Sequence, residues 1–120
     1  MKTKILLSLF CSLLFWANSY GTENEPNDTK GTANVLALNS SNTGSIGAAA
    51  DEDWWSVATS SDGKLDVTVT VSNGQYIRCF IYDKDGTTQL NYGETPGGPL
   101  TIGTDGLATG TYYIRLISYY

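Results

Sequence analysis

One stretch of this 120-residue chain, Leu65-Asp66-Val67-Thr68-Val69-Thr70-Val71, alternates apolar and polar side chains without a break. Successive side chains of a β-strand point to opposite faces, so the pattern predicts a strand in a sheet with one face in water. The other face of such a sheet is apolar and has to be covered by a second layer. The rest of the chain must therefore supply that layer.

The remaining segments predict more short strands, and no long helical pattern interrupts them. Strong strands are expected at 53–59, 76–82 and 110–117, and weaker ones at 44–47 and 100–102. Gly, Asn, Asp and Pro between them indicate turns at 60–63, 72–74, 83–86 and 105–106, and a loop at 90–99. The predicted fold class is all-β: an antiparallel β-sandwich, jelly-roll-like.

The first 21 residues are predicted to be a signal peptide. Lys2 and Lys4 precede an apolar run from Ile5 to Trp16, and the small residues Ala17 and Ser19 follow. This leaves one domain, residues 22–120, in a protein that is secreted to the extracellular space, the cell surface or the periplasm. An uncleaved membrane anchor is the alternative, but the apolar run is short for a span.

Charge and residue types exclude several functions. Loss of Lys2 and Lys4 leaves five of the seven basic residues against twelve acidic ones, a net charge of −7, which argues against nucleic acid and anionic membranes as partners. The chain has no histidine and, after cleavage, one cysteine, Cys79. Triad catalysis and zinc sites are thereby excluded. Cys79 shares a strand face with Ile77 and Ile81 and is expected in the core, so no enzyme is predicted.

Two acidic segments are candidates for binding a cation. Asp51 and Asp53 precede the pair Trp54-Trp55, which is expected to enter the core, and their spacing puts both carboxylates on one side of an extended chain. They are either turn residues or oxygen ligands. Residues 23–28 hold four more oxygen-bearing side chains. These belong either to a solvated linker, in which Asn27 or Asp28 caps a short helical turn through Ala33, Val35 and Leu36, or to a calcium site.

Taken in order, the motifs resemble the bacterial pre-peptidase C-terminal (PPC) domain. The matching elements are Glu25-Pro26-Asn27-Asp28-Thr29, Gly44-Ser45-Ile46, the Asp51–Val57 stretch, Leu65–Val69, Ile81–Gly86 and Leu107–Leu116. The resemblance implies a non-catalytic accessory domain of exported peptidases and other enzymes, related to the collagen-binding modules of clostridial collagenases. It further implies one Ca²⁺ site, with the ligand candidates Glu23, Glu25, Asn27, Asp28, Asp51 and Asp53.

The chain departs from that family in two ways. The family continues past the Gly110–Leu116 strand into a further strand, whereas this sequence stops at Tyr120. Either the last strand is missing and leaves an open edge, or the chain is a truncated product. There is also no catalytic domain, so the role of an appendage on an enzyme in the same chain does not carry over unchanged.

Two functions are expected to compete. In the first, exposed aromatic side chains on a sandwich face bind an extracellular protein or polysaccharide, with calcium fixing the N-terminal segment. The aromatic candidates are Tyr76, Tyr82, Tyr92, Tyr113 and Tyr119, and core or edge packing is the alternative for each. In the second, the chain is a structural or maturation-assisting part of a larger exported enzyme, with no ligand of its own.

Overall fold

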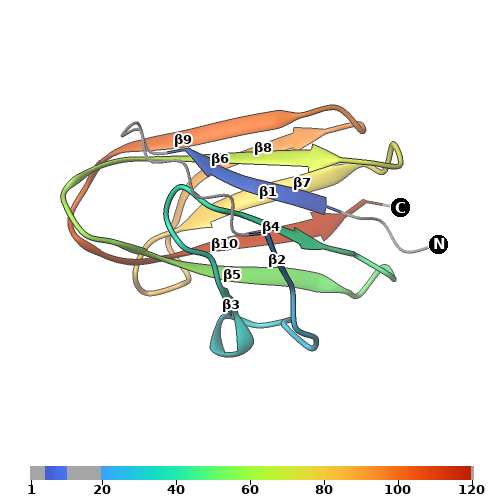
Figure 1. Cartoon of the computed structure of the whole chain (residues 1–120), viewed down its shortest axis with the longest axis horizontal. Helices are drawn as coiled ribbons and strands as arrows, with labels where there is room; N and C mark the ends of the chain where they lie inside the picture. Colours follow the sequence, from blue (N-terminus) through green and yellow to red (C-terminus); the bar gives the residue numbers. More distant parts are fainter. Residues whose placement is uncertain (1–4, 11–19, 120) are drawn as a thin grey trace.

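The computed structural model describes residues 5–10 and 20–119, with side-chain environments from Thr22 to Tyr119. Within this part of the chain, strands form two five-stranded sheets, and one 3-10 turn is the only helical element. The sheets lie face to face, one in front of the other in Figure 1. The prediction of an all-β, mostly antiparallel fold is confirmed. No helix in the described residues is long and apolar enough to cross a membrane.

Sheet A has the strand order β2-β4-β1-β6-β9. Its strands are β1 (Ile5–Phe10), β2 (Tyr20–Thr22), β4 (Ser41–Gly44), β6 (Gly63–Val71) and β9 (Leu100–Leu107). β1 is the central strand and is antiparallel to both of its neighbours, while β2 runs parallel to β4.

Sheet B has the order β3-β5-β10-β7-β8. Its strands are β3 (Asn34–Val35), β5 (Glu52–Thr59), β7 (Ile77–Tyr82), β8 (Gln89–Thr95) and β10 (Gly110–Ser118). All its pairs are antiparallel except β3 with β5. Long strands β5, β7 and β10 therefore form its centre, and the short β3 and the strand β8 form its edges.

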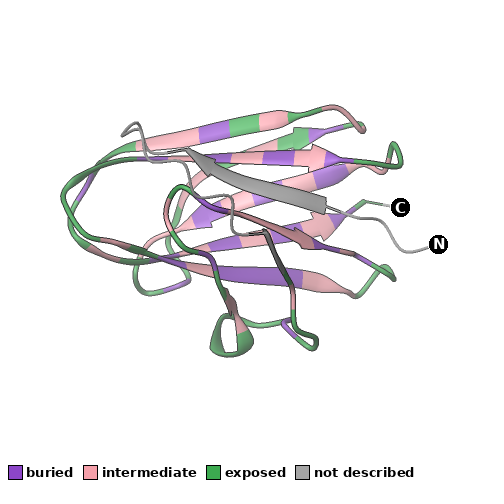
Figure 2. Ribbon diagram, viewed as in Figure 1, coloured by how far each residue is buried: buried purple, intermediate pink, exposed green. Residues whose placement is uncertain are grey.

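The core lies between the sheets and follows the period-two pattern of the sequence. Buried and half-buried residues alternate along β6, β7 and β10, as the coloured bands in Figure 2 show. Sheet A contributes Leu65, Val67, Val69 and Val71, and sheet B contributes Trp55, Val57, Ile77, Cys79, Ile81, Tyr112, Ile114 and Leu116. Cys79 is fully buried, as predicted, and burial raises the pKa of its thiol.

Three strand predictions were wrong in their bounds. Residues 90–99 were expected to be a loop, but Gln89–Thr95 is a strand paired with β7. The predicted turn at Asp105-Gly106 lies inside β9, where Gly106 has a φ of 69°. The strand expected at 44–47 ends at Gly44 instead. At β8, pairing with β7 overrides the local preference of the segment, and β9 accommodates a glycine with positive φ within the strand.

Residues 23–33, which we call the N-terminal segment, lie against both sheets. Its 3-10 turn, Lys30–Thr32, follows Thr29 as the N-cap, so neither Asn27 nor Asp28 has the capping role considered above. Glu23 N donates to Thr43 O at 2.9 Å, and Trp54 N donates to Asn27 O at 3.0 Å. These two backbone bonds fasten the segment to β4 and to β5.

The predicted signal peptide, residues 1–21, falls mostly outside the described residues. Within it, Ile5–Phe10 is strand β1, and Tyr20-Gly21 belongs to β2. Cleavage of the signal peptide stays a prediction.

Candidate metal centre

Asp53 is a fully buried carboxylate at the start of strand β5, with 0% of its surface exposed. It lies on the inner face of sheet B because it shares strand parity with Trp55 and Val57, which are core residues. Neither of its carboxylate oxygens accepts a hydrogen bond from any described residue. A buried charge without a hydrogen-bond partner is costly, so this group needs either a proton or a cation.

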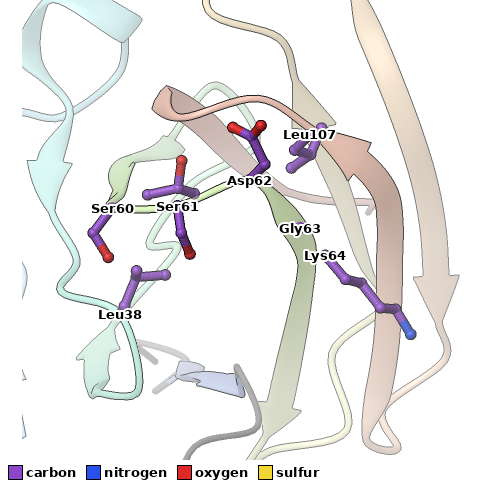
Figure 3. A pocket seen from close by; sticks show the side chains of 8 residues that line it. Leu38, Ser60, Ser61, Asp62, Gly63, Lys64 and Leu107 are labelled. Atoms are coloured by element: carbon purple, nitrogen blue, oxygen red, sulfur yellow. The ribbon is translucent and has the colours of Figure 1, made fainter.

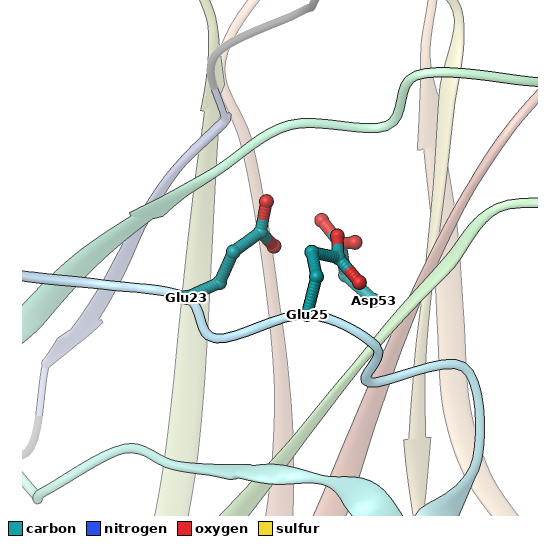
Figure 4. Close-up of side chains that lie close together, drawn as sticks. All are labelled: Glu23, Glu25 and Asp53. Carbon is teal, nitrogen blue, oxygen red and sulfur yellow. The ribbon is translucent and has the colours of Figure 1, made fainter.

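Glu23 and Glu25 bring two more carboxylates to Asp53. One oxygen from each of the three side chains lies within 4.8 Å of the others, and Figure 4 shows both glutamates reaching toward Asp53 from the N-terminal segment. We call these three residues the acidic cluster. Burial, together with the negative charges of Glu23, Asp51 and Glu25, raises the pKa of Asp53 to about 9. The pKa of Glu25 is raised as well, first by partial burial and then by Glu23, Asp51 and Asp28.

The acidic cluster is held in place by backbone groups. The amide of Ser45 donates to Glu23 Oε1, while Glu23 Oε2 makes no hydrogen bond with the described residues. Glu25 Oε2 accepts from Asn27 N at 3.1 Å. One oxygen of Glu23 and both of Asp53 thus stay available.

Gly44 creates the space between these carboxylates. A Cβ built on Gly44 would lie 2.9 Å from Glu23 Cδ and 3.1 Å from Asp53 Oδ2. Real Cβ atoms essentially never approach heavy atoms that closely, so any larger residue here would displace Glu23. Gly44-Ser45-Ile46 resembles a family motif, but neither Gly44 nor Ser45 was predicted to belong to the site. The run of Gly and Ser before Asp51 was the only signal for them.

Three other predicted ligands lie around the acidic cluster rather than in it. Asp51 Oδ2 accepts from Gly47 N at 2.5 Å, which is a turn role. Asp28 Oδ1 accepts from Glu52 N at 3.2 Å. Asn27 is fully buried, and neither its side-chain oxygen nor its nitrogen has a hydrogen-bond partner among the described residues. Its oxygen is therefore a fourth candidate ligand.

The donor set fits a hard divalent cation. Calcium binds oxygen at 2.3–2.6 Å, so two of its ligands are separated by at most about 4.6–5.2 Å. The 4.8 Å limit of the acidic cluster is within this range. All the donors are carboxylate or amide oxygens, and the chain has no histidine for zinc. Glu25 is exposed to solvent, so water could complete the six to eight ligands that calcium takes.

The outer face of sheet B carries a row of aromatic side chains. Trp54 stacks on Tyr82 with ring centroids 5.4 Å apart, Tyr82 on Phe80 at 6.1 Å, and Phe80 on Tyr92 at 5.5 Å. Trp54 was predicted in the core with Trp55, and this is wrong. It is 9% exposed because Tyr82 and Arg115 cover it on the outer face, not because it lies between the sheets.

Arg115 and Glu52 form an ion pair beside Trp54. Arg115 donates to Glu52 through Nε at 2.8 Å and Nη2 at 2.6 Å, and Trp54 Nε1 donates to the same carboxylate at 3.0 Å. Partial burial opposes ionisation of Glu52, but these hydrogen bonds outweigh it and lower the pKa of the carboxyl group. The network fixes the Trp54 end of the aromatic row.

The other end of the row is more open, and we call it the edge patch: Tyr76, Arg78, Tyr92, Glu94 and Tyr119. Tyr92 is 44% exposed and Tyr119 is 58% exposed. The guanidinium of Arg78 lies 4.3 Å from the Tyr119 ring centre and pairs with Glu94 at 3.1 Å. Of the five tyrosines predicted as binding candidates, Tyr76, Tyr92 and Tyr119 lie in this patch. Tyr82 is stacked under Trp54, and Tyr113 is half-buried between Ser56 and Tyr82.

A shallow pocket lies where β5 leads into β6, at the far end of sheet A from Gly44. Ser60, Asp62, Lys64 and Leu107 are among the residues that line it (Figure 3). Its one carboxylate, Asp62, already accepts from Thr109 N at 2.8 Å and closes the turn there.

No protein-family model matches this chain, and no curated protein matches it as a relative.

Proposed function

We propose that this chain is a secreted, non-catalytic accessory module of the PPC type, with a jelly-roll-like arrangement of its sheets and a Ca²⁺ ion bound in the acidic cluster. One observation carries the proposal: the buried Asp53 carboxylate has no hydrogen-bond donor and faces two further carboxylates. The ordered sequence motifs that resemble the PPC family give the same assignment independently.

Calcium would serve structure rather than chemistry. Glu23 and Glu25 belong to the N-terminal segment and Asp53 to sheet B, so an ion between them joins the two. It would also remove the repulsion among three carboxylates, which otherwise requires Asp53 to be protonated. A ligand that binds only the folded state stabilises it by about 2.7 kcal/mol at a hundred times its dissociation constant.

Calorimetric titration of the full chain with CaCl₂ tests the metal site. We expect one ion per chain and a melting temperature that rises with calcium and falls with chelator. Asp53→Asn keeps the size of the side chain and removes its charge, so it should abolish the rise in melting temperature with calcium. Asp105→Asn is the matched control, because Asp105 is an exposed carboxylate on β9, near the opposite end of sheet A. Equal melting temperatures with calcium and with chelator would reject the metal site.

The edge patch is the proposed contact surface for an extracellular protein or polysaccharide. Tyrosine and arginine are enriched where proteins bind partners, and here three tyrosines surround one Arg–Glu pair. The test is retention on insoluble collagen and on insoluble polysaccharides. Tyr92→Ala should lower retention, whereas Val35→Ala, at the opposite edge of sheet B and 77% exposed, should not.

The same measurements distinguish the proposed binding function from the alternative, structural function. If calcium raises the melting temperature and no matrix retains the protein, the chain acts as a structural or maturation-assisting domain with no ligand of its own.

A further inference from the structure

The central position of sheet A is filled by a segment that the sequence predicts to be removed. β1 joins the two halves of the sheet: Ile5–Ser8 pairs with β4, and Ile5–Phe10 pairs with β6. β4 and β6 are not neighbours in the strand order (Figure 1). We call the position between Ser41–Gly44 and Asp66–Val71 the strand slot.

Removal of residues 1–21 would leave the strand slot open. Neighbouring strands lie about 4.7–4.9 Å apart, so β4 and β6 would face each other across about 9.5 Å with their backbone groups unpaired. β2 would keep only Thr22 of its three residues. Unpaired backbone groups in the middle of a sheet are costly, and the slot lies beside β6, whose valines are buried.

The gap cannot close simply by β4 moving onto β6. β4 is tied to the N-terminal segment, because Glu23 N donates to Thr43 O and Ser45 N donates to Glu23. Gly44 also borders Glu23 and Asp53. Moving β4 by one strand spacing would break these contacts, so they hold the slot at the width of one strand.

The register defines what kind of segment fits. Positions 5, 7 and 9 are paired with Val71, Val69 and Val67, which are buried, and directly opposite residues share a face of the sheet. Positions 6, 8 and 10 are paired with Thr70, Thr68 and Asp66, which are half-buried on the other face. The slot therefore suits a strand that is apolar at every second position and polar between.

The sequence of strand β1 meets only half of this requirement. The run Ile5–Phe10 does not alternate as the slot requires: its sequence is apolar at 5, 7 and 9, but also at 6 and 10, the positions paired with Thr70 and Asp66. A continuous apolar run is what export requires of a signal peptide and not what this sheet requires.

We propose that the strand slot is an acceptor site for an extended segment of another polypeptide, six residues or more in length, with alternating apolar and polar side chains. In the uncleaved chain, Ile5–Phe10 fills the slot. β4 borders the slot, and β3 and the strands from β5 to β10 keep partners of their own, so the described residues after Thr22 contain no spare strand, and neither would a second copy. Addition of a strand to open sheet edges is an established mode of peptide recognition. The proposal depends on the predicted cleavage and not on calcium.

The test starts from the full chain in its folded state. A protease recognition sequence replaces residues 12–18, outside the described part, and the folded protein is cut there. A fluorescent eight-residue peptide that alternates valine with threonine and lysine is then added in excess. The control peptide carries proline in place of the central valine, which removes a donor and does not fit inside a sheet. The uncut protein is the matched control for uptake.

We expect the cut N-terminal fragment to stay bound and then to be replaced by the alternating peptide, with the proline peptide binding about tenfold more weakly or worse. Hydrogen exchange should show the amides of Asp66–Val71 losing protection when the fragment is stripped and regaining it with the peptide. If stripping unfolds the protein, the peptide should restore the fold. The proposal is overturned if the amides keep their protection without any strand, if the fragment cannot be displaced, or if the peptide neither binds nor restores the fold.

Discussion

Glu23 and Asp53 present carboxylates to one space from two different parts of the fold, and Gly44 keeps that space open. A Cβ on Gly44 would lie 2.9 Å from Glu23 Cδ and 3.1 Å from Asp53 Oδ2. The site therefore depends on a residue that contributes no ligand atom.

Gly44→Ala should weaken calcium binding about tenfold to a hundredfold, because the methyl group displaces a ligand and shifts of this kind cost about 1–3 kcal/mol. Calorimetric titration measures the change. Gly47→Ala is the matched control: its Cβ would meet Asp51 Oδ2 at 3.5 Å, an ordinary contact. Equal affinities for the two variants would show that Gly44 does not shape the site.

The cation-free protein should become less stable as pH rises. The pKa of Asp53 is raised from its ordinary 3.8 to about 9 in the folded state, so folding binds a proton. The stabilisation from this proton is complete below the ordinary pKa of 3.8. It is lost as pH rises from there through about 9, the pKa of Asp53 in the folded state. Each kcal/mol lost lowers the melting temperature by about 4–8 °C in a domain of this size.

Melting in chelator from pH 5 to pH 9 measures this dependence. Asp53→Asn should flatten the curve, and saturating calcium should reverse the loss, because the ion binds the deprotonated carboxylate. A melting temperature that rises with pH in the presence of chelator would contradict the assignment.

Glu52→Gln should destabilise the protein by about 1 kcal/mol, because it weakens a two-point Arg115 pair and a bond from Trp54. Glu94→Gln is the comparison: its pair with Arg78 has a single nitrogen–oxygen contact and more exposed partners, so its loss should cost less than that of Glu52. Urea unfolding of both variants gives the two values. If Glu94→Gln destabilised the protein more than Glu52→Gln, the outer-face network around Trp54 would add little to stability.

Gly93→Ala should cost about 1–3 kcal/mol, because a Cβ there would lie 2.6 Å from Ile102 Cγ2 and 3.1 Å from Leu100 Cδ1. Gly98→Ala, whose Cβ would be 3.6 Å from Thr95 Oγ1, should be nearly neutral. The same unfolding measurement applies. If both variants were neutral, β8 would not pack closely against β9 at this point.

Cys79 should resist thiol reagents in the folded protein, because it is fully buried and its thiol pKa is raised. Labelling of a Cys11→Ser chain should be slow in buffer and fast in denaturant. Rapid labelling of the folded chain would show that the β7 region opens easily.

β6 was predictable because its side chains alternate over the seven residues Leu65–Val71. β8 was missed for a physical reason. Gly93 suggests a loop locally, yet it allows Ile102 and Leu100 to approach the strand, which only the assembled sheets reveal. β9 was cut short for a similar reason, since Gly106 takes a positive φ within a strand.

The acidic cluster was only partly predictable. The sequence supplied two acidic segments, and the fold brings Glu23, Glu25 and Asp53 together while Asp51 and Asp28 bond to backbone amides. Strand parity with Trp55 could have shown that Asp53 faces the core and Trp54 does not. The run of Gly and Ser before Asp51 was not enough to identify Gly44, because its role depends on packing across the chain.

The two adjacent tryptophans report on different sides of one sheet. Trp55 is 1% exposed in the core, on the same face as Asp53, and Trp54 lies under Tyr82 on the outside. In a Trp16→Phe chain, which lacks the third tryptophan, their fluorescence should therefore separate events that a melting curve combines. Ion binding at Asp53 should alter the emission of Trp55, while a ligand that disturbs the aromatic row should change the quenching of Trp54. One dipeptide thus provides two optical probes without any label.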